Sequence, residues 1–126
     1  MDRGGSDLHL TTNSPPQVRV DGALRPLADL PPLGAAETKQ LAYSVLTDAQ
    51  KKRFEETQEL DLAFGIRGLA RFRCNVFNQR GAVAAVYRLI PETIRSFEDL
   101  GLPPIIATLA QRPRGLVLVT GPTGSG

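Results

Sequence analysis

Apolar and polar side chains alternate with a period of two near the start of the chain. Every second position is apolar over residues 8–10 and again over residues 18–20. This period is typical of half-buried strands. The pair Asp21-Gly22 favours a tight hairpin turn, because both residues tolerate positive φ angles. A partner strand is predicted near residues 24–27, where Pro26 limits it to a sheet edge or a short pairing.

The period changes in the next segment, from about Ala35. The side chains that share one face of the predicted helix are Thr38, Leu41, Ala42 and Val45. A second helix is predicted from Asp48 to about Thr57, because Thr47 and Gln50 have the spacing of a capping box. We expect the charged residues of this second helix to form a solvated face.

Three further strands have the clearest patterns in the sequence. Residues 60–66 alternate, and Gly65 and Gly68 are predicted to bracket a turn. Residues 70–76 place Ala, Phe, Cys and Val on one face and polar side chains, Arg71 and Arg73 among them, on the other. After a turn at 78–81, a more continuously apolar strand covers 82–90. The sequence therefore predicts an α+β domain, with an antiparallel sheet covered by two helices.

A second, shorter unit is predicted after Pro91. Residues 93–104 have the composition of a linker, with a short helical stretch from Thr93 to Leu100. Residues 105–111 are expected to be helical. The apolar run in 115–120 is typical of a buried parallel strand.

This predicted strand leads directly into a glycine-rich segment. It supplies the first six positions of the P-loop pattern G-x-x-x-x-G-K-[ST], in which backbone N–H groups cradle phosphates. A glycine-rich surface turn is the alternative, and the preceding strand favours the P-loop. The chain has neither the Lys nor the Ser or Thr that would follow, so we expect it not to hydrolyse ATP alone. The candidate nucleotide-binding residues are Gly121, Pro122, Thr123, Gly124, Ser125 and Gly126.

Composition narrows the possible functions. The 126 residues have room for one ordinary domain, and a net charge of +2 is too small to predict a nucleic-acid partner. Cys74 is the single cysteine, which excludes an internal disulfide and favours a reducing cytoplasm. The apolar runs are far shorter than the roughly 20 residues of a membrane-spanning helix, so no direct membrane insertion is expected. The isolated His9 is expected to be structural, and no metal site is predicted.

Several segments together resemble the type IV pilus retraction ATPases of the type II/IV secretion ATPase family. The resemblance covers nearly the whole chain. It is carried by Ser6-Asp-Leu-His-Leu10, Pro16-Gln-Val-Arg-Val-Asp-Gly22, Gly68-Leu-Ala-Arg-Phe-Arg-Cys-Asn75, Tyr87-Arg-Leu-Ile-Pro91, Ser96-Phe-Glu-Asp-Leu100 and the run from Pro113 to Gly126.

The resemblance implies a PAS-like amino-terminal domain over residues 1–92, a linker over 93–104 and the start of a RecA-like ATPase domain over 105–126. It also implies a homo-hexamer that uses ATP and Mg²⁺ and acts with a platform protein of the inner membrane. Such a motor lies in the cytoplasm, peripheral to the inner membrane at the pilus base. Relative to the family, the chain starts without the usual helix before Ser6 and stops within the P-loop.

In such motors, arginines of the amino-terminal sheet reach toward the phosphates of the nucleotide. Arg73 and Arg88 match these positions best, and Arg71 and Arg80 are weaker candidates. An arginine on a solvent-facing strand can also serve solubility alone. Two other functions remain open: a motor for pilus extension or type II secretion, and a stand-alone PAS-like binding module.

Overall fold

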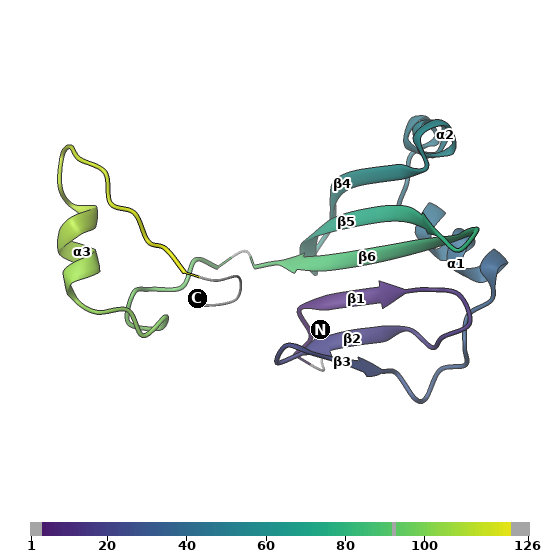
Figure 1. Cartoon of the computed structure of the whole chain (residues 1–126), viewed down its shortest axis with the longest axis horizontal. Coiled ribbons are helices and arrows are strands. Elements are labelled where there is room, and N and C mark those ends of the chain that lie inside the picture. Colours follow the sequence, from purple (N-terminus) through teal and green to yellow (C-terminus); the bar gives the residue numbers. More distant parts are fainter. Residues whose placement is uncertain (1–3, 92, 122–126) are drawn as a thin grey trace. The chain divides into compact units, whose positions relative to one another are not determined.

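The computed structural model describes residues 4–91 and 93–121, and the chain divides into two units, Met1–Glu92 and Thr93–Gly126. The first unit contains a six-stranded sheet with the order β3-β2-β1-β6-β5-β4, in which all neighbouring strands are antiparallel (Figure 1). The predicted antiparallel sheet is thus confirmed. Its strands are β1 (Asp7–Leu10), β2 (Gln17–Val20), β3 (Ala23–Pro26), β4 (Glu59–Ile66), β5 (Ala70–Gln79) and β6 (Ala82–Ile90).

Two tight turns set the register of the hairpins. Asp21 and Gly22 join β2 to β3 with φ angles of 48° and 80°, and Arg80 and Gly81 join β5 to β6 with φ angles of 52° and 79°. Positive φ at both central residues is what a two-residue hairpin turn requires. The β5–β6 turn is shorter than predicted, because β5 continues to Gln79. Similarly, Gly65 lies within β4, and the turn before β5 covers residues 67–69.

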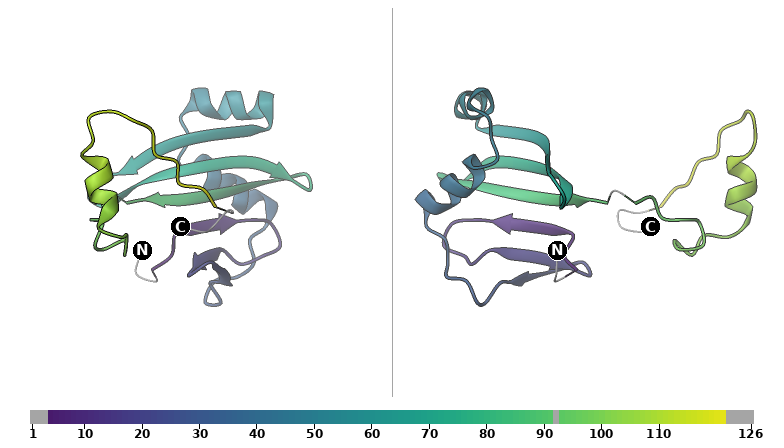
Figure 2. Two further views of the ribbon diagram at one scale, coloured as in Figure 1. Left: turned by 60° about the vertical axis from the view of Figure 1, so that its left-hand side comes forward. Right: turned by 180° about the vertical axis from the view of Figure 1, so that it is seen from behind.

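Two helices pack against the sheet, α1 (Ala35–Tyr43) against β6 and α2 (Asp48–Thr57) against β4 (Figure 2). The predicted capping box is confirmed: the Gln50 amide donates to Thr47 Oγ1 at 3.3 Å, and the Thr47 amide donates to Gln50 Oε1 at 2.9 Å. The predicted face of the first helix is partly wrong. Thr38 and Ala42 are buried, whereas Leu41 is 42% exposed and Val45 follows the helix end.

The core lies between these helices and one face of the sheet. Phe54 of α2 is 2% exposed, and Cys74 and Val76 of β5 are completely buried. Tyr87 and Ala85 of β6 belong to the same cluster. The apolar face predicted for residues 70–76 is therefore the core face. The opposite face carries the charged side chains Arg73 and Arg88, together with Phe77, Ala84 and Val86.

The second unit has little regular structure. Its helix α3 (Ile105–Ala110) confirms one prediction. The helix predicted over 93–100 is wrong: only a turn forms at 97–101, where Ser96 and Asp99 cap one another and Gly101 adopts a φ of 67°. Gly101 stops the turn before it extends into a helix.

The strand predicted over 115–120 is also wrong. These residues have no regular structure, and Leu116 and Val119 are 82% and 88% exposed. A strand needs a neighbour for its backbone hydrogen bonds, and no strand occurs in the described part of this unit. Across residues 4–91 and 93–121, no helix has the length and apolarity to cross a membrane.

Candidate functional site

A row of charged side chains crosses the polar face of the sheet. In the strand register, Arg19 of β2 lies opposite Asp7 of β1, Asp7 lies opposite Arg88 of β6, and Arg88 lies opposite Arg73 of β5. Directly opposed residues of neighbouring strands point to the same face. These four residues, which we call the charged row, therefore lie side by side across four strands.

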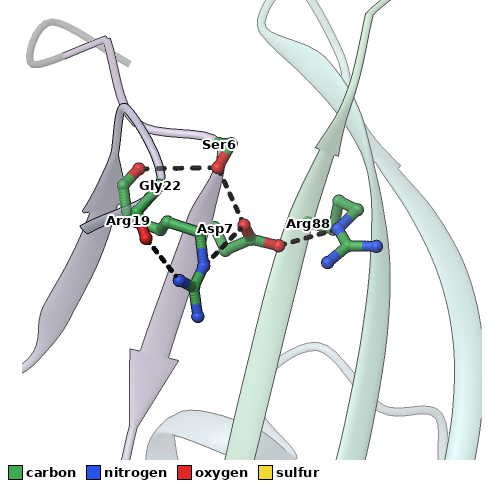
Figure 3. A network of polar contacts seen from close by, with 5 residues as sticks. All are labelled: Ser6, Asp7, Arg19, Gly22 and Arg88. Carbon is green, nitrogen blue, oxygen red and sulfur yellow. Dashed lines mark hydrogen bonds and ion pairs between the residues drawn. The ribbon is translucent and has the colours of Figure 1, made fainter. Parts of the chain in front are cut away.

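Asp7 occupies the centre of the charged row, between two guanidinium groups (Figure 3). Its side chain is 4% exposed, and its Oδ1 accepts a hydrogen bond from Arg88 Nε at 2.7 Å. Its Oδ2 accepts from the Ser6 hydroxyl at 2.8 Å and lies 3.5 Å from Arg19 Nε. A buried carboxylate is tolerated only when it is paired and hydrogen-bonded, and both of its oxygens meet this condition.

These contacts set the protonation state of Asp7. Burial alone would raise the pKa of its carboxyl group, but the hydrogen bonds from Arg88 and Ser6 and the charge of Arg88 lower the pKa below its ordinary value. Asp7 is therefore ionised at neutral pH. Burial and the charge of Arg19 lower the pKa of His9, so this histidine adds no positive charge near the row.

Arg88 and Arg19 are held in different ways. Arg19 approaches Asp7 with its Nε and donates from Nη1 to the carbonyl of Gly22 at 2.8 Å, so both sides of its guanidinium are engaged. Arg88 contacts Asp7 through Nε, and its side chain is 67% exposed. Among the described residues its two Nη groups have no hydrogen-bond partner. Arg88 thus keeps the pair of donors that bind a phosphate or carboxylate in bidentate fashion.

Arg73 lies directly opposite Arg88 and is exposed. No acidic partner for Arg73 is found within the described parts of the chain. Like charges on directly opposed strand positions destabilise a sheet, so this pair carries an energetic cost. The charged row contains three arginines and one carboxylate, so its net charge is +2. Such a surplus attracts an anion to the surface over β5 and β6.

The other predicted residues are placed less favourably. Arg71 lies two positions before Arg73 on the same face of β5 and can extend the positive surface. Arg80 lies in the β5–β6 turn, roughly 23 Å along the strand from Arg73 at about 3.3 Å per residue. Gly121 belongs to the second unit and has no regular structure, and residues 122–126 lie outside the described residues.

Sequence reasoning missed Asp7 and Arg19. Both residues occupy polar positions in strands whose side chains alternate between apolar and polar. This alternation was the one sequence signal that could have pointed to them. Asp7 meets Arg19 through the pairing of β1 with β2, and it meets Arg88 through the pairing of β1 with β6, whose partners are far apart in sequence. The alternation gives the face of each side chain but not its neighbour on another strand.

The opposite face of the sheet contains an apolar groove of about 560 Å³. Leu8, Val18, Phe72 and Tyr87 line it from the sheet, and Leu41 lines it from α1, which explains the exposure of that leucine. The described residues contain no group of three His, Cys, Asp or Glu side chains that could hold a metal ion.

Comparison with known proteins adds the decisive observation. Over 124 residues the chain is 48% identical to the type IV pilus retraction ATPase PilT of Pseudomonas aeruginosa, a match that covers 98% of this chain and 36% of PilT. The chain is homologous to the amino-terminal third of PilT-type ATPases. A crystal structure of the pilus retraction motor PilT with bound ADP has a TM-score of 0.81 and 50% identity, covering 99% of this chain and 36% of that one.

Other PilT-type relatives support the same assignment. The twitching motility protein of Neisseria gonorrhoeae is 45% identical over 111 residues, covering 88% of this chain and 29% of that protein. The type II secretion system ATPase E of Vibrio cholerae is more distant, with 30% identity over 133 residues, 98% of this chain and 26% of its own length. No protein-family model matches the chain. The chain spans about a third of the length of these curated relatives.

Proposed function

We propose that this chain forms the amino-terminal domain of a hexameric ATP-driven motor that powers type IV pilus retraction and twitching motility. The observation that carries the proposal is the 48% identity to PilT over 98% of the chain. The weaker identity of 30% to a type II secretion ATPase favours retraction over secretion. In this proposal the domain is PAS-like, and residues 105–126 lead through Gly121 into the P-loop of a RecA-like ATPase domain.

We infer the role of this domain in the motor from the charged row. Within residues 4–91 and 93–121, both Nη groups of Arg88 lack a hydrogen-bond partner and Arg73 lacks an acidic one, so both side chains can approach the phosphates of a nucleotide bound by the ATPase domain. There they would stabilise the charge that develops during phosphoryl transfer, as arginine fingers do. Arg71 would add positive charge on the same face.

The complete motor would need a nucleotide, a metal ion and partner proteins. ATP would bind with Mg²⁺, which the ATPase domain would hold. Six copies of the complete protein would form the ring and would contact the platform protein of the pilus machine. The motor would act in the cytoplasm, at the inner membrane beneath the pilus.

A chimera tests the proposal. This chain replaces the matching third of Pseudomonas aeruginosa PilT, which supplies the rest of the ATPase. We expect Arg88→Ala or Arg73→Ala to lower ATP turnover at least about tenfold, since an arginine finger can contribute roughly 10³ to 10⁵ in kcat. Arg53→Ala, an equal loss of charge at an exposed position of α2, is the matched control and should leave turnover unchanged. Normal turnover in both variants of the charged row would remove them from the nucleotide site.

A further inference from the structure

The buried carboxylate of Asp7 has no role in the proposed function, although it occupies the centre of the charged row. We propose that Asp7 is a positioning residue for Arg88: it holds the guanidinium by Nε and thereby directs the two Nη groups toward a phosphate of the nucleotide. This inference rests on the proposed function of Arg88. It extends the site from the arginines to the carboxylate that orients them.

The geometry separates an anchored end from a free end of the same side chain. The anchoring hydrogen bond is 2.7 Å long and ends on a carboxylate that is 4% exposed, whereas the Arg88 side chain is 67% exposed. An arginine side chain has many rotamers, and an untethered residue must lose that conformational entropy when it binds a phosphate. The bond to Asp7 removes part of that entropy before the nucleotide arrives.

Asp7 is itself held in place from several sides. The Ser6 hydroxyl donates to Oδ2, and Arg19 lies on the same oxygen while its Nη1 is bound to Gly22. The backbone just before Asp7 is also tightly packed, because a Cβ on Gly5 would lie 2.1 Å from Val18 Cγ1. The carboxylate is therefore a rigid anchor for the Nε of Arg88, while most of the Arg88 side chain is exposed.

The alternative is that Asp7 only neutralises a charge in the sheet. The two roles differ in what they require of residue 88. For neutralisation a lysine is as good as an arginine. For positioning, the partner needs one donor for Asp7 and two more for the phosphate, and only the guanidinium has them in a rigid fork.

Turnover by the chimera described above distinguishes these roles. We expect Asp7→Asn to lower kcat on the order of tenfold, because a misdirected catalytic group loses much of its effect. In an Arg88→Ala background, Asp7→Asn should cause no further loss. Arg88→Lys retains the charge and should still lose nearly as much turnover as Arg88→Ala. Asp61→Asn, which removes a carboxylate from the next row of the same face, is the matched control and should turn over normally.

Nuclear magnetic resonance of the isotope-labelled chain gives an independent readout. The Arg88 Nε–Hε resonance should be shifted and protected from exchange in the wild type and in Asp61→Asn. In Asp7→Asn it should move to the position of an exposed arginine, while the amide resonances of the core strands remain unchanged.

The outcomes separate the inference from the proposed function. Normal turnover of Arg88→Ala removes Arg88 from the nucleotide site and overturns the positioning role with it, whereas the proposed function fails only if Arg73→Ala is normal as well. If Arg88→Ala lowers turnover but Asp7→Asn does not, the positioning role alone is overturned. The same holds if Asp7→Asn lowers turnover by an equal factor with and without Arg88. The positioning role is also overturned if Arg88→Lys has full ATP turnover, or if Asp7→Asn leaves the Arg88 Nε–Hε resonance unchanged.

Discussion

The ionised state of Asp7 makes the stability of the domain depend on pH in a defined direction. The folded protein holds this carboxyl group with a lowered pKa, so the unfolded chain binds its proton more readily. Stability from this group is fully present above the unfolded pKa of about 3.9 and is lost as the pH falls through the folded pKa. The effect disappears if residue 7 cannot ionise, as in Asp7→Asn.

The magnitude follows from the exposure of the partners. A hydrogen bond to a charged group contributes about 1.5–3 kcal/mol, and breaking a fully buried ion pair costs about 3–5 kcal/mol. Water can replace much of the lost contact at Arg88, because that side chain is 67% exposed. Exposed pairs contribute about 0.2–1 kcal/mol. We therefore expect Asp7→Asn to destabilise the domain by about 1–2 kcal/mol at neutral pH.

Urea unfolding of the wild type and Asp7→Asn at about pH 7, 5 and 3 measures this effect. The difference in unfolding free energy between the two proteins should be constant above about pH 5 and should shrink below about pH 4. Asp61→Asn, whose hydrogen bond to Asn75 is exposed, should differ from the wild type by less than about 0.5 kcal/mol at neutral pH. A difference for Asp7→Asn that stays constant or grows toward pH 3 would refute the reasoning.

Two further predictions concern the core beneath the site. Phe54 is the residue that α2 buries, so Phe54→Ala should lower the unfolding free energy by about 3–5 kcal/mol in urea titrations, against a change within about 0.5 kcal/mol for the exposed Lys52→Ala. Burial raises the pKa of the Cys74 thiol to about 12, so at pH 8 a chromogenic disulfide reagent should react with it only as the protein unfolds; rapid labelling of the folded chain would contradict its burial.

Local patterns were sufficient to predict most of the first unit. The period of two placed the strands, and the start of the helix at Asp48 was predicted correctly because Thr47 and Gln50 form a capping box within four residues. The same reasoning failed for residues 115–120. Their apolar, β-branched composition is typical of a buried strand, but a strand also needs a neighbour, and composition does not supply one.

In the candidate site, too, the local sequence predicts the face of each side chain but not its partner on a distant strand. Alternation placed Arg71 and Arg73 on the polar face of β5, and this face is the one observed. The contact between Arg88 and Asp7 joins positions that are distant in the sequence and depends on the pairing of β1 with β6. A one-residue change in that register would move Asp7 to the opposite face, so the pair is defined only by the folded sheet.

The charged row also explains why its arginines are not equivalent, although they carry the same charge. From β2 to β5 the side chains become progressively less engaged: Arg19 is bound on both sides, Arg88 through Nε alone, and Arg73 by no acidic group among the described residues. An anion binds most favourably where hydrogen-bond donors have no partner and where its negative charge reduces an existing repulsion between positive charges. Both conditions are met between Arg88 and Arg73, since these two positive charges lie directly opposite one another. In the proposed motor the phosphate would therefore lie over β5 and β6, and Asp7 and Arg19 would hold the edge of the site.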